Sequence, residues 1–183
     1  MKNEQKKIAT TALKLLQRKK WNTIELNEIK KKSKVKSFDK IIKNKQDVLR
    51  KINNYFDYQL SLSIRNIEKS DNKDMIFEII MMRFDILQNY RKAILSLFNS
   101  FKQKPKQLIF LLPELLDSIL NMVKVTNISY KGIKGQLKIK GVFIIYISTF
   151  LTWVKDETES LEKTMTALDK YLDQAGSMLK IIK

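Results

Sequence analysis

Apolar residues recur along this chain at spacings of three and four, the period of an α-helix, and no segment sustains the apolar–polar alternation of a strand. Only four glycines and two prolines interrupt the pattern, so turn signals for a sheet are scarce. The pattern predicts an all-α fold of about eight or nine helices. Apolar residues make up 44% of the 183 residues, which favours a packed core over a disordered chain.

Four helices are expected in the first part of the chain. They are predicted over residues 3–18, 24–33, 36–43 and from 46 into the polar stretch 68–74. Thr23 is the expected N-cap of the second helix, and a break near Ser33 and Lys34 separates it from the third. A long helix, two short helices at a tight turn and a longer helix form a helix-turn-helix arrangement, whose second short helix lies in the major groove of DNA.

The second half of the chain is more apolar. We predict helices over 75–90 and 91–101, a further helix that kinks or restarts at Pro113, a loop over 125–136, and two last helices over 136–154 and 157–179. The last helix has apolar residues at alternate spacings of four and three, a narrow seam that suits packing on another helix. The seam consists of Leu161, Met165, Leu168, Leu172, Ala175 and Leu179.

Positive charge is concentrated near the N-terminus. The chain carries a net charge of +17, and residues 1–51 hold 17 Lys and Arg against five Asp and Glu. In the third helix, Lys36, Lys40 and Lys43 lie within about 60° of one another on a helical wheel, opposite its apolar residues. A solvated surface helix shows the same wheel, but a lysine-rich composition alone would spread the charge evenly. The concentration therefore favours a surface that binds a polyanion.

Several classes of chemistry are excluded by composition. The chain has no cysteine and no histidine, which removes disulfides, thiolate chemistry, the commonest zinc ligands and the commonest general base. No glycine-rich phosphate loop and no nucleophile–base pair is visible, so we expect no enzyme, metal or cofactor. The longest apolar stretch, 142–154, is shorter than the roughly 20 residues that cross a bilayer, and the N-terminus is charged. We expect a cytoplasmic protein without a transmembrane segment.

Residues 8–49 carry a pattern of paired large apolar residues, a Thr-led second helix, a tight turn and an acidic–apolar helix start. The matching positions are Leu15-Leu16, Thr23-Ile24, Leu26 with Ile29, Ser33-Lys34-Val35 and Lys45-Gln46-Asp47-Val48-Leu49. This stretch resembles the TetR/AcrR family of bacterial transcriptional regulators. The segments MIFEIIMMRFDILQNYRKAI and FLTWVKDETESLEKTMTALDKYLD are similar to those of alphaproteobacterial TetR-type proteins.

The resemblance implies a DNA-binding domain over 1–50 and a helical regulatory and dimerisation domain over 51–183. It implies a homodimeric repressor that binds double-stranded operator DNA. The DNA-contacting candidates are Thr23, Lys34, Lys36, Ser37, Lys40, Lys43 and Lys45. In the family the last two helices of each subunit form the dimer interface, which here suggests Phe143, Ile147, Leu161, Met165, Leu168 and Leu172. The alternative is that the seam residues pack only within their own subunit.

A ligand pocket is a further expectation from the apolar residues of the second half. The candidates are Met81, Met82, Phe84, Phe98 and Phe110. Two interpretations stay open: these residues line a cavity for a small apolar or lipid-like effector, or they fill a core.

The chain departs from the family pattern at the turn and third helix. Lys34 stands where the family has a turn glycine, Asp39 where a phosphate-contacting Tyr is usual, and the stretch between the turn and Lys45 is two residues shorter. The alternative function is that of the TetR-fold lipid-binding accessory proteins of ubiquinone biosynthesis, with which the chain shares Trp21 and the spacing of Trp153 and Asp156.

Overall fold

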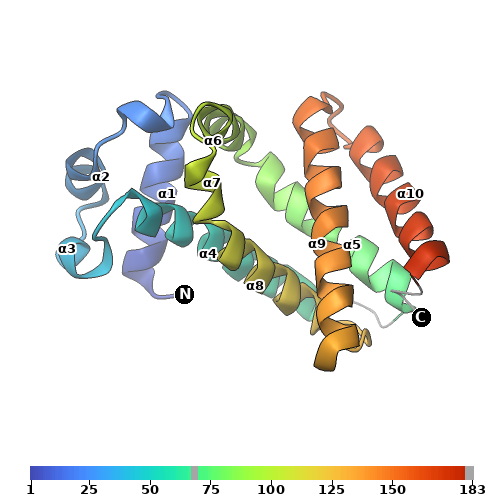
Figure 1. Cartoon of the computed structure of the whole chain (residues 1–183). Coiled ribbons are helices and arrows are strands. Elements are labelled where there is room, and N and C mark those ends of the chain that lie inside the picture. Colours follow the sequence, from blue (N-terminus) through green and yellow to red (C-terminus); the bar gives the residue numbers. More distant parts are fainter. Residues whose placement is uncertain (67–69, 180–183) are drawn as a thin grey trace. The chain divides into compact units, whose positions relative to one another are not determined.

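The structure is a computed structural model that describes residues 1–66 and 70–179 (Figure 1). Within those residues it contains ten α-helices, two 3₁₀-helices and no strand, so the predicted all-α class is confirmed. The chain divides into two compact units, Met1–Leu62 with Ile86–Leu115 and Ser63–Asp85 with Leu116–Lys183. Part of the predicted polar stretch 68–74 and the side chain of Leu179 lie outside the described residues.

The first unit is built around the N-terminal helix. Its elements are α1 (Asn3–Leu16), η1 (Trp21–Thr23), α2 (Leu26–Ser33), α3 (Phe38–Ile41), α4 (Lys45–Ser63), α6 (Arg91–Gln103), α7 (Lys106–Ile109) and the start of α8 (Leu112–Val123). The apolar face of α1 is fully covered, with Ile8, Ala12 and Leu13 all at 0% exposure. α1 packs against α2 and α6, and α6 also contacts η1 (Figure 1). Burial of this stripe is what holds α2 beside α1.

The tight turn differs from the prediction in two details. Helix α3 covers only Phe38–Ile41 instead of 36–43, because Val35 and Phe38 are drawn into the core and the chain leaves the helix at Ile42, which is also buried. Thr23 is not the N-cap of α2; it lies in η1, and Glu25 takes the N-cap position without a side-chain cap.

Helix α4 begins at a capping box. The Asn44 side chain accepts a hydrogen bond from the Asp47 amide at 3.0 Å, and the Asp47 carboxylate accepts from the amides of Asn44 and Lys43 at 3.2 and 2.8 Å. These bonds satisfy N–H groups that the first helical turn leaves without partners. They fix where α3 ends and α4 starts.

The second unit comprises η2 (Ile64–Asn66), most of α5 (Asn72–Gln88), the end of α8, α9 (Gly132–Lys155) and α10 (Glu162–Leu179). α9 and α10 run side by side, joined by the short connection 156–161 (Figure 1). Aromatic rings from α5 and α9 form its centre: Phe84 stacks on Tyr146 with ring centroids 5.4 Å apart and lies 6.2 Å from Trp153. Arg83, which is 1% exposed, donates to the Tyr146 hydroxyl at 3.2 Å.

The last helix begins at Glu162, five residues later than predicted, because the preceding residues form a cap. The buried Asp156 carboxylate accepts hydrogen bonds from the amide and hydroxyl of Thr158 at 3.1 and 2.6 Å and from the amide and hydroxyl of Thr164 at 2.8 and 2.7 Å. Burial alone would raise the pKa of Asp156, but these bonds lower it to about 2. Leu161, at the end of the connection, adopts a left-handed conformation with φ 55°.

Helix α9 begins at Gly132 instead of residue 136. A β-carbon on Gly135 would lie 2.1 Å from the Tyr130 carbonyl carbon, so the helix start requires glycine there.

The 24 residues of α9 are long and apolar enough to cross a membrane, which the sequence had not indicated. Core helices of soluble proteins also have this length and composition. Here Val142, Tyr146 and Trp153 of α9 are buried within the unit.

Pro113 is the second residue of α8, so the predicted restart of the helix is confirmed.

Candidate nucleic-acid interface

Lys34 ends α2 in the left-handed conformation that the family's turn glycine would adopt. Its φ and ψ are 53° and 33°, and its amide donates to the Lys30 carbonyl at 3.2 Å. A residue with a β-carbon is strained there by about 1 kcal/mol. The turn therefore keeps its geometry without glycine, and the side chain of Lys34 is exposed beside it.

Three of the predicted DNA-contacting lysines are available to a ligand. Lys34, Lys36 and Lys40 are exposed, and across the described ranges none of them forms an ion pair or hydrogen bond through its ammonium group. Lys31, near the end of α2, is in the same situation. Four unpaired cations on the turn and its two flanking helices can each neutralise a phosphate.

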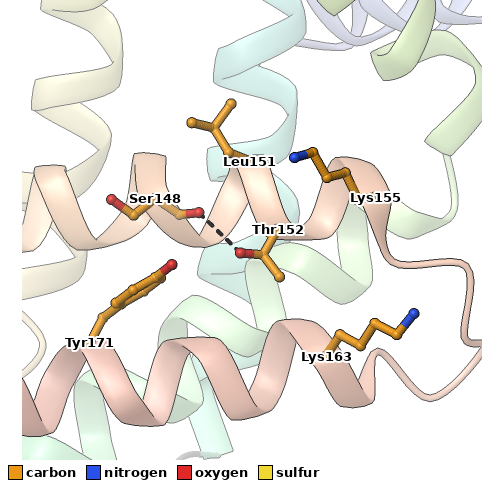
Figure 2. Close-up of a pocket in the computed structure, with 6 residues that line it drawn as sticks. All are labelled: Ser148, Leu151, Thr152, Lys155, Lys163 and Tyr171. Atoms are coloured by element: carbon orange, nitrogen blue, oxygen red, sulfur yellow. Dashed lines mark hydrogen bonds between the residues drawn. The ribbon is translucent and has the colours of Figure 1, made fainter.

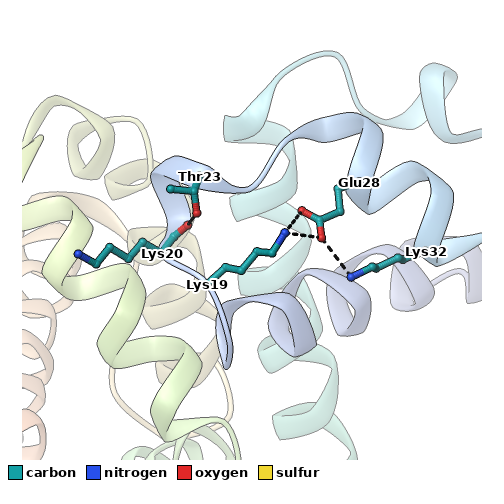
Figure 3. Close-up of polar contacts among 5 residues, drawn as sticks. All are labelled: Lys19, Lys20, Thr23, Glu28 and Lys32. Atoms are coloured by element: carbon teal, nitrogen blue, oxygen red, sulfur yellow. Dashed lines mark hydrogen bonds and ion pairs between the residues drawn. The ribbon is translucent and has the colours of Figure 1, made fainter.

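Three other candidates already have partners. The Lys43 ammonium donates to the Asp39 carbonyl at 2.6 Å, which helps to close α3. The Ser37 hydroxyl donates to the Glu4 carboxylate at 2.7 Å and thereby attaches α3 to α1. The Thr23 hydroxyl donates to the Lys20 carbonyl at 2.9 Å (Figure 3). In these positions the hydroxyls of Ser37 and Thr23 do not offer a proton to a phosphate oxygen.

Lys45 is part of the scaffold. Its ammonium donates to the backbone carbonyls of Trp21 and Asn22 at 3.0 and 3.3 Å and lies 5.1 Å from the centre of the Trp21 ring. Burial lowers the pKa of Lys45. The cation thus ties the start of α4 to η1. Packing alone therefore explains why Trp21 and Lys45 occur together in this chain, without a role in binding DNA or lipid.

Carboxylates neutralise part of the basic surface. Glu28 accepts from Lys19 at 2.8 Å and from Lys32 at 3.1 Å, as Figure 3 shows, and these two lysines lower its pKa. Asp39, which occupies the family's tyrosine position, is paired with Lys30 of α2. The pairing offsets the repulsion that an isolated aspartate would exert on DNA phosphate.

The predicted dimer residues divide into two groups. Leu161, Leu168 and Leu172 are 1%, 0% and 0% exposed within the chain itself, so the alternative, packing within their own subunit, describes these three. Met165 on the same helix is 42% exposed. Phe143 and Ile147 on α9 are partly buried.

Helix α9 carries an exposed apolar stripe, of which only Ile147 was among the predicted dimer residues. Exposed fractions are 91% for Ile133, 58% for Leu137, 64% for Ile144 and 47% for Leu151, and Ile147 lies between the last two. The spacings, four and three in alternation when Lys140 is counted, are those of a helix-pairing seam. That periodicity was visible in the sequence but was obscured by the lysines and glycines of 131–141.

The predicted ligand-pocket residues differ in burial and belong to both units. Phe84 is fully buried in the aromatic core of the second unit, and Met81 and Met82 are half-buried on the same helix. In the first unit, the ring of Phe98 is covered by the Lys102 ammonium at 4.6 Å, and Phe110 is 54% exposed. The core interpretation therefore fits Phe84, and a closed pocket does not fit Phe110.

The chain is similar to a solved structure along nearly its whole length. The crystal structure of the TetR transcriptional regulator from Nitrosomonas europaea ATCC 19718 superposes with a TM-score of 0.75, covering 97% of this chain and 100% of that chain. The chain has the TetR fold. The predicted architecture, an N-terminal helix-turn-helix followed by a C-terminal helical domain, is thereby confirmed. Sequence identity is 19%, so the likeness concerns the fold. No protein-family profile and no curated protein matches the sequence.

Proposed function

We propose that the protein is a homodimeric, cytoplasmic, DNA-binding transcriptional regulator of the TetR type that acts as a repressor. The observation that carries the proposal is the combination of the TetR fold with unpaired lysines on the turn and on α3. Residues 1–50 would bind DNA and 51–183 would regulate and dimerise. Of the predicted pocket residues on α5, the half-buried Met81 and Met82 would contact an apolar effector, whereas Phe84 fills a core.

Electrostatic contact with phosphates would dominate binding. Helix α3 is four residues long and offers Asp39 and Lys40 at its surface, with no arginine to pair bidentately with guanine. Lys31, Lys34, Lys36 and Lys40 from two copies would provide up to eight phosphate contacts. The logarithm of the binding constant would then fall with the logarithm of salt concentration with a slope of about −7 at most.

The second copy would pack on the exposed apolar stripe of α9. Ile133, Leu137, Ile144 and Leu151 are all partly or largely exposed, and Met165 of α10 lies on the neighbouring helix of the same unit. In the dimer, α9 and α10 of one copy would pack against α9 and α10 of the other and bury these side chains. The burial would stabilise the dimer by about 25 cal/mol for each Å² of apolar surface covered.

The experiment is a fluorescence-anisotropy titration of a labelled duplex at several salt concentrations from about 50 to about 200 mM. Binding that depends on phosphate contacts should weaken strongly across this range. The triple variant Lys34→Ala, Lys36→Ala and Lys40→Ala should bind at least about tenfold more weakly and with a shallower salt slope. The matched control is a second triple variant in which three exposed lysines elsewhere, Lys92, Lys124 and Lys131, are replaced by alanine. Its net charge equals that of the first triple variant.

Two results would contradict the proposal. One is the absence of duplex binding by the wild-type protein at the lowest salt. The other is an equal loss of affinity in the control triple variant, which would mean that net charge alone is responsible.

A surface lipid-binding function is the second candidate, favoured by one exposed segment. Leu108, Ile109 and Phe110 are 38%, 60% and 54% exposed, and exposed lysines stand at 102, 104 and 106. Adjacent large apolar side chains with lysines beside them suit an anionic lipid surface. Sedimentation with anionic but not neutral vesicles, lost in the Ile109→Ser, Phe110→Ser variant, together with no duplex binding, would establish this function in place of the first.

A further inference from the structure

The turn and α3 carry the side chains that a helix-turn-helix protein would direct at the edges of bases. This stretch covers residues 34–44, from the residue that ends α2 to the residue before α4. Reading a base pair in the major groove takes a matched group: arginine or lysine for guanine, the oxygen and NH₂ of an amide together for adenine, and a carboxylate for cytosine. The partners that these groups already have within the chain therefore decide how much sequence the protein can read.

The amide and the hydroxyl of this stretch are held by neighbouring helices. The Asn44 side-chain oxygen accepts from the Asp47 amide at 3.0 Å, so it is engaged in the capping box of α4. The Ser37 hydroxyl donates to the carboxylate of Glu4 in α1 at 2.7 Å. Neither side chain can turn to a base edge without breaking the bond that positions α3 or the start of α4.

Two charged residues of the same stretch are engaged as well. Asp39 pairs with Lys30 of α2, and the Lys43 ammonium donates to the Asp39 carbonyl at 2.6 Å. A carboxylate can accept from cytosine. For Asp39 that contact would require giving up Lys30, and the DNA phosphates would repel the bare carboxylate on its way into the groove.

The groups that remain are ammonium groups. Lys31, Lys34, Lys36 and Lys40 are exposed, and in residues 1–66 and 70–179 no ion pair or hydrogen bond engages their ammonium groups. An ammonium group is a compact charge that a phosphate of either strand can satisfy. Lysine can also donate to guanine, so a modest preference for G·C pairs is the most that this surface offers by hydrogen bonding.

The proposed dimer adds cations without adding a base-reading group. Leu151 belongs to the apolar stripe on which the second copy would pack, and Figure 2 shows it pointing away from Lys163 and Tyr171 of α10. The second copy has the same pairings at its own turn and α3, so the dimer supplies each phosphate contact twice. Its binding then depends on where phosphates lie and not on which bases they flank.

We propose that the protein binds duplex DNA through its phosphate backbone and does not read a base-specific operator. The inference rests on the DNA-binding part of the proposed function and narrows it. The partner is double-stranded DNA of any sequence, in contrast to the operator that the family resemblance implies. Repression then depends on how much of the protein covers the DNA, and sequence matters only where it changes the shape of the duplex.

The test compares duplexes of equal length and different sequence at one salt concentration. The full chain is titrated by fluorescence anisotropy with an alternating A·T duplex, an alternating G·C duplex and the duplexes that repeated binding enriches from a random-sequence pool. All dissociation constants should lie within about tenfold of one another, whereas sequence-specific proteins prefer their sites by about 10³-fold or more.

Two variants separate phosphate contacts from base contacts. Lys40→Ala should weaken binding to every duplex by the same factor, and Ser37→Ala should leave the ratios between duplexes unchanged, because a phosphate contact carries no sequence information. The matched control, Lys92→Ala, removes an exposed lysine of α6 and should bind every duplex as the wild type does.

The outcomes distinguish this inference from the function on which it rests. A duplex bound more than about tenfold more tightly than the others, or a ratio between duplexes that changes in Lys40→Ala or Ser37→Ala, overturns the inference and leaves the proposed regulator in place. Failure to bind any duplex refutes the proposed function, and the inference with it.

Discussion

Replacing Lys34 with glycine should stabilise the protein. Lys34 holds φ 53° and ψ 33° at the end of α2, where a β-carbon costs about 1 kcal/mol and glycine is unstrained. Among residues 1–66 and 70–179 its side chain has no partner whose loss would offset the gain. For a chain of this length, about 1 kcal/mol corresponds to a rise in Tm of about 2–4 °C.

The assay is thermal and urea unfolding followed by circular dichroism, with Lys34→Ala as the control. Alanine removes the same charge but keeps the β-carbon, so Lys34→Ala should unfold close to the wild type. The two variants should lose duplex affinity equally, because both lack one cation near the phosphates. Equal stability of the glycine and alanine variants would show that the turn is unstrained and that the reasoning is wrong.

Two further predictions concern the second unit. At pH 7, Asp156→Asn should lower the free energy of unfolding by about 2 kcal/mol, since the carboxyl pKa falls from 3.8 to about 2 on folding. Because the folded pKa is the lower one, the wild type should lose this contribution as pH falls from about 4 to about 2. The difference in urea midpoint between the wild type and Asp156→Asn should therefore shrink across that pH range. Gly135→Ala should destabilise by about 1–3 kcal/mol through the clash with Tyr130, whereas Gly176→Ala, which meets no atom within 4 Å, should stabilise α10 slightly; equal midpoints for the two would contradict the close approach.

Local signals in the sequence predicted the helices well where the chain itself fixes them. The extent of α1, the start of α4 and the restart at Pro113 all depend on neighbours a few positions away. The starts of α9 and α10 were misplaced because contacts several residues distant decide them. Asp156 reaches Thr164 across eight positions, and Gly135 packs on Tyr130.

The candidate site was predicted by residue type more successfully than by role. Lysine at 34, 36 and 40 is exposed as expected, but Lys45 has the same charge and is held against Trp21. A periodic pattern shows that one helix face is apolar without showing what covers it. For this reason the sequence left open whether Leu161, Leu168 and Leu172 contact a partner or their own subunit, and the structure buries all three within the chain.

The ion pair between Lys30 and Asp39 connects α2 with α3, the proposed recognition helix of only four residues. Such surface pairs contribute about 0–1 kcal/mol and weaken as ions accumulate. If the protein binds DNA as proposed, raising the ionic strength would therefore loosen the attachment of α3 to α2 as well as shield the DNA phosphates. A count of phosphate contacts taken from the slope of a salt titration would then be too high, and Asp39→Asn offers a calibration in which only the shielding remains.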